Sequence, residues 1–394
     1  MAEELNGNAL IVQLGESTPA LNAVLGGAVN EALNHGQVEE IYGSLHGLQG
    51  LMNEELIDLA EESQQTIRGL RYTSGVALGG GRGLPRQGYE WERIIDVLQA
   101  QNIRFLVLCG GLEAVEAGLQ IENLARNFGY QVHVMVAPAS LRNDIPMTDH
   151  CPGYASAVKD LSVMLRNLCN ACEGQGMRDL VSIVEVPGGT TGWLAAGASM
   201  ARRRNHLEDP PHILLMPERP MVAEMLLMRV QEVLKQQPFC MIVVADDIVD
   251  ADGNYVTNVQ PTDPLAPYAG HGVGRILQGL IEQSLGALDS HVVGYQQLLG
   301  CNAMCLSETD VDEAMRVGAV AVEAAVNGQT GKMVALLRAE ADHYAAETSL
   351  VALADISGQV KVFPEAWLGE DGMNVSYQFQ KYMTPLIQGE VEVP

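Results

Sequence analysis

Residues 104–114 read RFLVLCGGLEA and contain the pattern on which the fold prediction depends. The short apolar run 104–109 predicts a buried strand, since such runs bounded by turn residues are typical of parallel sheets. Gly110 and Gly111 follow directly, and we expect the strand to end there. An amphipathic stretch then runs from Glu113 to Phe128 and predicts a helix. Strand, glycine turn and helix together form half of a βαβ unit.

The same order recurs along the chain and predicts an α/β fold with parallel sheets. The predicted strands are 9–14, 104–109, 131–136, 181–186, 213–216, 241–245, 291–293 and 333–337. The predicted helices are 113–128, 153–172, 221–236, 272–285 and 310–327. Most of these strands run into a cluster of Gly, Pro or Asp. Because the carboxyl ends of parallel strands line the ligand crevice of an open sheet, we expect these clusters to lie near one cleft.

Length and charge limit the class of protein. A chain of 394 residues is long enough for two α/β domains. The 23 Lys and Arg against 49 Asp and Glu give a net charge of −26, which disfavours binding to nucleic acid or to an anionic membrane surface. No apolar run is long enough to span a bilayer, and the first eight residues do not resemble a signal peptide. We therefore expect a soluble, cytoplasmic protein.

The seven cysteines are odd in number and scattered, which is typical of reduced thiols in a cytosolic protein. Cys169 and Cys172 form a CxxC pair, but the pair lies inside a predicted helix and has no second pair nearby. We interpret both as packed helix residues rather than as a zinc or redox site.

Nine short motifs lie mainly at the predicted strand ends. They are 15–22 (GESTPALN), 76–82 (VALGGGR), 109–114 (CGGLEA), 138–146 (PASLRNDIP), 184–195 (VEVPGGTTGWLA), 217–218 (PE), 270–274 (GHGVG), 293–298 (VGYQQL) and 327–333 (NGQTGKM). In this order they resemble motifs of the 6-phosphofructokinase family, over nearly the whole chain. The tail from Phe363 to Ile387 resembles the pyrophosphate-dependent branch of the family. Members of that branch use magnesium to convert fructose 6-phosphate and pyrophosphate to fructose 1,6-bisphosphate and phosphate.

The resemblance implies a phosphofructokinase-like α/β fold: two domains with parallel sheets flanked by helices, and a cleft between them. We expect an N-terminal domain at 1–152, the former phosphate-donor side. The second domain is expected at 153–340, the former sugar-phosphate side, and a segment at 341–394 is expected to pack across both.

Several residues depart from the family pattern where phosphoryl transfer needs them. The family's proton-accepting base is the first Asp of T-I-D-N-D, and here that position is Arg142, beside the retained Asp144. A guanidinium cannot accept the proton, because its pKa lies above about 12. The metal-site Asp is Leu112, which offers no oxygen to magnesium, although the adjacent Glu113 could substitute for it. We therefore expect no metal.

The phosphate-binding residues are also altered. The resemblance assigns donor-phosphate contacts to Gly15, Glu16, Arg82, Gly110 and Gly111, and Glu16 replaces a Gly, adding bulk and negative charge. On the sugar-phosphate side the remnants are expected at Gly188, Glu218 and Tyr295, while two family Arg positions are Gly189 and Leu298, and Asp246 shortens a family Glu. The sequence is compatible with a residual anion site at Arg82. It is equally compatible with an internal ion pair of Arg142 with Asp144 that fills the cleft, and with a cleft adapted to another anion.

The resulting functional prediction is a non-catalytic member of the family. We expect a regulatory or structural subunit that binds a catalytic phosphofructokinase or forms a homo-oligomer, with no cofactor. The alternative is an active but divergent 6-phosphofructokinase, dependent on pyrophosphate or ATP and on Mg²⁺, that makes fructose 1,6-bisphosphate in glycolysis.

Overall fold

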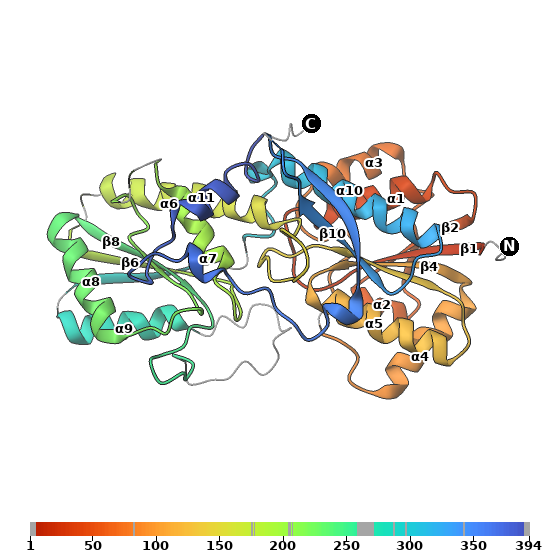
Figure 1. Cartoon of the computed structure of the whole chain (residues 1–394), viewed down its shortest axis with the longest axis horizontal. Helices are drawn as coiled ribbons and strands as arrows, with labels where there is room; N and C mark the ends of the chain where they lie inside the picture. The colour runs from red at the N-terminus through yellow and green to blue at the C-terminus, as the bar shows by residue number, and fades with distance from the viewer. Residues whose placement is uncertain are drawn as a thin grey trace. The chain divides into compact units, whose positions relative to one another are not determined.

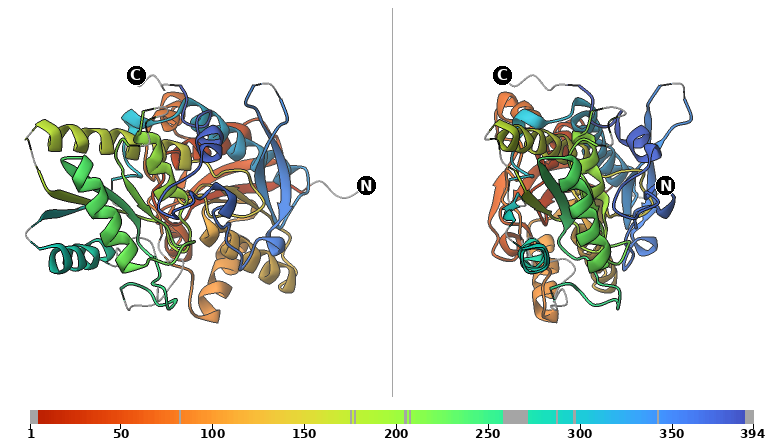
Figure 2. Two further views of the ribbon diagram at one scale, coloured as in Figure 1. Left: turned by 60° about the vertical axis from the view of Figure 1, so that its left-hand side comes forward. Right: turned by 90° about the vertical axis from the view of Figure 1, so that its left-hand side faces the viewer.

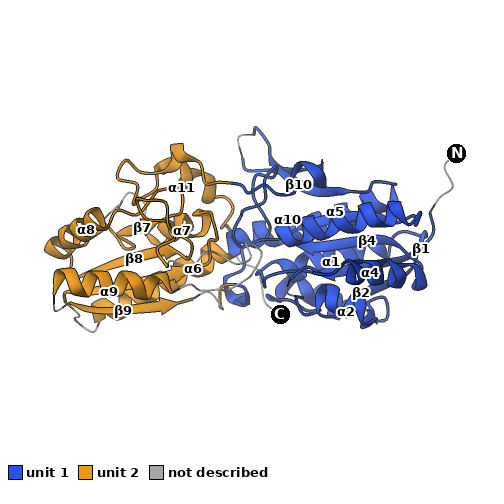
Figure 3. Ribbon diagram, turned by 90° about the horizontal axis from the view of Figure 1, so that it is seen from below, with its two compact units in different colours: residues 1–156, 300–361, 389–394 blue, residues 157–299, 362–388 orange. Residues whose placement is uncertain are grey.

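The computed structural model describes residues 5–81, 83–174, 176, 178–203, 206, 208–257, 272–286, 288–295, 298–341 and 343–389. The chain divides into two compact units (Figure 3). Unit 1 consists of Met1–Ser156, Gly300–Lys361 and Gly389–Pro394, and unit 2 consists of Ala157–Leu299 and Val362–Gln388. Among the described residues, no helix is both long enough and apolar enough to cross a membrane.

Unit 1 is built on a seven-stranded sheet of order β11-β10-β5-β4-β1-β2-β3. Its central strands pair in parallel, whereas β3 and β11 are antiparallel edge strands. The antiparallel β10–β11 pair forms one edge of the sheet (Figure 2). The strands are β1 (Gly7–Gln13), β2 (Val38–Ser44), β3 (Leu56–Asp58), β4 (Ile103–Gly110), β5 (His133–Pro138), β10 (Lys332–Arg338) and β11 (Ala346–Ala352).

Helices cover both faces of this sheet (Figure 1). On one face α1 (Leu21–Ala32) packs against α10 (Glu308–Val326), and on the other lie α2 (Gly47–Met52), α4 (Gly88–Ala100) and α5 (Leu112–Asn127). Two apolar clusters follow, one on each side of the sheet. The remaining short helices of unit 1 are α3 (Gln64–Gly69) and the 3₁₀ turns Leu70–Tyr72, Ala303–Cys305 and Leu353–Asp355.

Unit 2 has a smaller parallel sheet of order β7-β8-β6-β9. In Figure 1, α6 lies above this sheet and α8 and α9 lie below it. The strands are β6 (Leu180–Val186), β7 (Ile213–Leu215), β8 (Phe239–Ala245) and β9 (Asp289–Gly294). The helices are α6 (Tyr154–Gly174), α7 (Trp193–Gly197), α8 (Ala223–Gln236), α9 (Val273–Leu285), α11 (Tyr377–Met383) and the 3₁₀ turns Ala198–Ala201 and Glu365–Trp367.

The predicted α/β class with parallel sheets is confirmed, and every predicted strand and helix overlaps an observed one. Elements that lack a long apolar run were missed, among them β2 and the short β3. Helix α1 was missed as well, because its sequence LNAVLGGAVNEA is apolar nearly all round and shows little helical periodicity.

The domain boundaries differ from the prediction in the C-terminal third. Residues 300–361 lie in unit 1, although they were mostly assigned to the second domain. The physical reason is that β10 joins the unit 1 sheet beside β5, and that α10 packs closely on α1. An added Cβ at Gly27 would come within 2.0 Å of the Met315 carbonyl oxygen, so only glycine permits this helix approach. The predicted segment 341–394 is divided, with 362–388 in unit 2.

Candidate functional site

The first candidate loop follows β1 and contains Gly15 and Glu16. Gly15 has a φ of +83°, and its N–H donates to the Gly81 carbonyl at 3.2 Å. An added Cβ at Gly15 would lie 3.4 Å from Oε2 of Glu113, at the start of α5. The positive φ favours glycine here, and the Glu113 carboxylate lies close beside the backbone.

Gly110 is the last residue of the neighbouring strand β4, which is hydrogen-bonded to β1, and Gly111 follows it. A Cβ at Gly110 would meet the Leu14 carbonyl oxygen at 2.5 Å, so the two strand ends approach each other backbone to backbone. Gly111 is the N-cap of α5. The structure thus brings the predicted donor-side residues Gly15 and Gly110 together. Arg82, also assigned to this side, lies outside the described residues.

Arg142 and Glu16 form an ion pair between the loop after β5 and the loop after β1. Nη2 of Arg142 donates to Oε1 of Glu16, and their side chains are only 12% and 13% exposed. Arg142 therefore does form an internal ion pair, but its partner is Glu16 rather than Asp144. The Arg142 Nε is buried and makes no hydrogen bond.

Asp144, the retained carboxylate, is held by its own loop. Its Oδ1 accepts a hydrogen bond from the Ser140 hydroxyl at 2.7 Å, and the Ser140 oxygen in turn accepts the Arg142 N–H at 3.2 Å. The Asp144 side chain is buried. The Ser140 hydroxyl thus fixes the backbone N–H of Arg142 and the side chain of Asp144. The side chains of Arg142 and Asp144 therefore bond different partners, Glu16 and Ser140.

The region around Leu112 offers little to a metal ion. Leu112 is the first residue of α5, and Glu113 beside it is buried at 4% exposure near Gly15. Among the residues that the structure describes, only His206, Glu208 and Asp209 in unit 2 form a group of three potential ligands. Asp209 of that group already pairs with Arg203 at 2.7 Å. The expectation of no metal stays a prediction.

The residues predicted as sugar-phosphate remnants, Gly188, Glu218 and Tyr295, lie in unit 2 after the carboxyl ends of β6, β7 and β9. The N–H groups of Gly188 and Gly189 both donate to Oδ1 of Asp246 at 2.9 Å. These backbone donors are thus already satisfied by a side chain of the same unit. Tyr295 donates weakly to the two carboxylate oxygens of Asp160, at 3.3 and 3.4 Å.

Glu218 is a second carboxylate engaged by backbone groups in unit 2. Its Oε1 accepts the N–H of Gly192 at 2.9 Å and the N–H of Phe363 at 3.0 Å. Oε2 is buried and makes no hydrogen bond. Burial raises the pKa of Glu218, although the backbone donors oppose the shift. Leu298, at a family Arg position, is 57% exposed.

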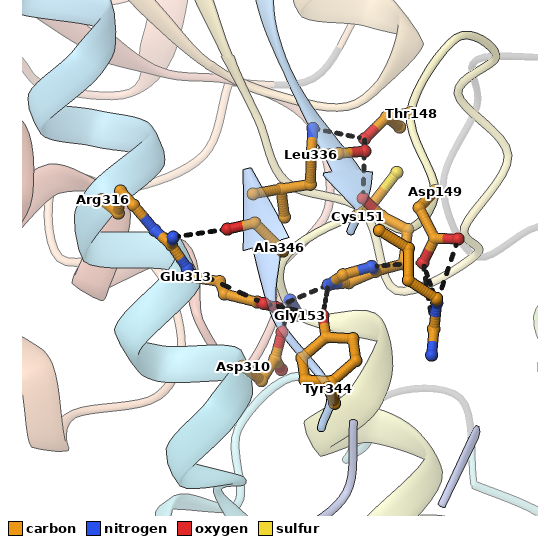
Figure 4. A network of polar contacts seen from close by, with 12 residues as sticks. Thr148, Asp149, Cys151, Gly153, Asp310, Glu313, Arg316, Leu336, Tyr344 and Ala346 are labelled. Carbon is orange, nitrogen blue, oxygen red and sulfur yellow. Dashed lines mark hydrogen bonds and ion pairs between the residues drawn. The ribbon is translucent and has the colours of Figure 1, made fainter. Parts of the chain in front are cut away.

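Sequence reasoning missed a polar network in unit 1 centred on His150. Figure 4 labels Asp149, Glu313 and Tyr344 of this network. The His150 ring bonds Asp149 at 2.9 Å through Nδ1 and Glu313 at 2.6 Å through Nε2. The Tyr344 hydroxyl donates to Glu313 at 2.7 Å, and Arg338 pairs with Asp149 at 3.1 Å. These residues come from three distant stretches of the chain, so no spacing in the sequence indicates the network.

Comparison with known proteins gives a consistent result. The family model described as Phosphofructokinase matches residues 8–325. The chain is 31% identical to the pyrophosphate–fructose 6-phosphate 1-phosphotransferase of Halomonas elongata, over 97% of this chain and 92% of that protein. The protein of the same name from Xanthomonas campestris is also 31% identical, over 98% and 92%. The crystal structure of pyrophosphate-dependent phosphofructokinase from Marinobacter aquaeolei superposes with a TM-score of 0.86 at 28% identity, covering 98% of this chain and 92% of that one.

Proposed function

The chain belongs to the phosphofructokinase family, and from this premise we propose that it is a non-catalytic member that acts as a regulatory or structural subunit. The observation that carries the proposal is the ion pair of Arg142 with Glu16. By resemblance, Arg142 occupies the position of the catalytic base. A guanidinium paired with a carboxylate stays protonated and cannot take the proton of a sugar hydroxyl.

The pair also changes the electrostatics of the donor side. A pyrophosphate or nucleotide donor is a polyanion, and its transfer depends on cationic groups that absorb developing charge. The Arg142 guanidinium is already neutralised by Glu16, whose carboxylate stands where the family has a glycine. Two departures that look like separate losses in the sequence, a new cation at 142 and a new anion at 16, therefore neutralise each other. The pair avoids an uncompensated buried charge but restores no base.

Metal and sugar-phosphate contacts are weakened independently. The alkyl side chain of Leu112 supplies no oxygen ligand for Mg²⁺. Gly189 and Leu298 stand where the family has arginines, and a charge-assisted hydrogen bond to a phosphate is worth about 1.5–3 kcal/mol each. Losing two such bonds would lower affinity for fructose 6-phosphate by roughly two to four powers of ten.

The alternative function is an active, divergent 6-phosphofructokinase that uses pyrophosphate or ATP with Mg²⁺. It is favoured by the full-length match to relatives that carry the phosphotransferase name. The buried Asp144 and Glu218 are both retained, and Glu113 approaches Gly15 on the donor side. For Asp144 to act as the base, one of its carboxylate oxygens would have to accept the proton of the sugar hydroxyl, and the Ser140 hydroxyl donates to Oδ1 only.

We expect the purified chain to show no turnover of fructose 6-phosphate with either pyrophosphate or ATP in the presence of Mg²⁺. An assay coupled to fructose 1,6-bisphosphate measures this, with the Halomonas elongata relative as the positive control under identical conditions. Family enzymes in the usual range would turn over at about 1 s⁻¹ or faster. A rate of that size from this chain, abolished by Asp144→Asn, would establish the alternative function.

As a non-catalytic subunit the chain would act through association. Either a catalytic phosphofructokinase or a second copy of this chain is the proposed partner, in the cytoplasm. Native mass spectrometry of the complex isolated from its source cell tests this. A monomer bound to no family member would contradict the subunit role, whatever the assay shows.

A further inference from the structure

Lys361 is the last residue of the unit 1 stretch Gly300–Lys361, and the chain continues into unit 2 at Val362. Its ammonium donates to Asn143 Oδ1 at 3.1 Å and to the carbonyls of Thr148 and Asp149 at 3.2 and 2.7 Å. Enclosure of this ammonium lowers the pKa of Lys361. The Lys361 side chain therefore holds both ends of the loop 143–149.

The backbone of Lys361 is fixed to the same loop. Its N–H donates to the Asp144 carbonyl at 2.7 Å. Asn143 adopts a φ of +54°, and its Oδ1 also accepts the Cys151 N–H at 2.9 Å. Asn143 directly follows Arg142, so the position of Lys361 and the position of the ion-paired guanidinium are linked through a short, hydrogen-bonded stretch of chain.

On the unit 2 side, Phe363 is fixed just as firmly. Its N–H donates to Oε1 of Glu218 at 3.0 Å, the same oxygen that accepts from Gly192. Its ring is buried and lies 5.0 Å from the ring of Trp193 and 5.4 Å from that of Phe379, centroid to centroid. A change in the position or charge of the Glu218 carboxylate would therefore act directly on the backbone of Phe363.

One residue, Val362, separates the two fixed points, and its side chain is 61% exposed. Because peptide units are planar and rigid, only the dihedral angles between Lys361 and Phe363 can absorb a displacement of Phe363. The hydrogen bonds at both ends restrict those angles. A change at Glu218 is therefore expected to reach loop 143–149.

We propose that residues 361–363 couple the Glu218 site of unit 2 to loop 143–149 of unit 1, which directly follows Arg142, with Lys361 as the positioning residue. Binding of a phosphorylated sugar, or any ligand that alters Glu218, shifts the stability of the loop and of the Arg142–Glu16 pair. The coupling uses only hydrogen bonds within each unit and the covalent chain. It holds for a non-catalytic protein and for an active one alike.

Hydrogen–deuterium exchange of the full chain tests the coupling. Glu218→Ala removes the acceptor for the Phe363 N–H, and we expect peptides covering 139–151 to exchange about fivefold faster or more, the size of a typical coupling free energy of about 1 kcal/mol. Glu218→Gln keeps an acceptor oxygen and is expected to change exchange there less than about twofold. Glu365→Gln, on the same segment but 80% exposed, is the matched control and is expected to have no effect.

A second pair of variants separates coupling from general destabilisation. In a Lys361→Met background, Glu218→Ala is expected to leave exchange in 139–151 unchanged, because the connection is already broken. Glu218→Asp, which retracts the carboxylate by one methylene, replaces Glu218→Ala if that variant does not fold. Acceleration confined to unit 2 peptides, or acceleration that persists with Lys361→Met, would overturn the inference without bearing on activity.

Discussion

Replacing Arg142 by methionine is expected to lower the free energy of unfolding by about 3–5 kcal/mol, the usual cost of removing one partner of a buried ion pair. The Glu16 carboxylate is 13% exposed and would remain in place without its counter-charge. Methionine keeps the length and most of the apolar contact of the arginine stem, so lost packing contributes little. Urea unfolding followed by circular dichroism measures the change.

Two comparisons show whether the pair itself carries the effect. The double variant Glu16→Gln, Arg142→Met removes both charges and is expected to recover most of the lost stability. Arg93→Met breaks a surface pair with Glu54 in which both side chains are 44% exposed, and should cost less than about 1 kcal/mol. If Arg142→Met costs no more than Arg93→Met, the Arg142–Glu16 pair does not stabilise unit 1.

The second large effect is expected at His150, in the network of Figure 4. His150→Gln is expected to lower the free energy of unfolding by about 3 kcal/mol at pH 6, because it leaves Glu313 and Asp149 without the imidazolium between them. Burial by itself lowers the pKa of His150, but hydrogen bonds and charge from Asp149 and Glu313 outweigh it and raise the pKa above 6.5. Among the described residues, further titratable or charged groups around the network are Tyr344, Arg338, Asp310, Arg316 and Lys361.

The pH dependence follows from the direction of that shift. A histidine whose folded pKa is raised binds its proton more tightly in the folded state, so its contribution is complete below the unfolded value of 6.5. The contribution is lost as pH rises through the folded pKa, with a slope of at most about 1.4 kcal/mol per pH unit. The stability difference between the unsubstituted protein and His150→Gln should therefore shrink above neutral pH.

His212 provides an internal control of opposite sign. Burial lowers its pKa to about 4, and Nδ1 accepts the Met241 N–H at 2.9 Å, which requires the neutral ring. Its contribution is complete above 6.5 and is lost as pH falls toward 4. The difference between the unsubstituted protein and His212→Gln should thus shrink in acid. A His150→Gln difference that stays constant from pH 6 to 9 would show that folding does not raise the pKa of His150.

The α/β class, the strand–turn–helix order and the phosphofructokinase resemblance could all be predicted from the sequence. They depend on local periodicity and on motifs at strand ends, which neighbouring residues determine. The assignment of 300–361 to unit 1 could not, since it depends on β10 pairing with β5, from a stretch of chain about 200 residues earlier. The His150 network was missed for the same reason, because Glu313 and Tyr344 reach His150 only through tertiary packing.

The amino-acid sequence alone determines that position 142 carries a permanent cation and that the side chain at position 112 has no oxygen, because both are covalent properties of the side chains. Only the tertiary structure decided what the cation meets. Glu16 and Arg142 are 126 residues apart, and they pair because β1, β4 and β5 are successive neighbours in one parallel sheet whose carboxyl ends lie at the same edge. Strand order is a long-range property of the folded chain, so no local pattern contains it.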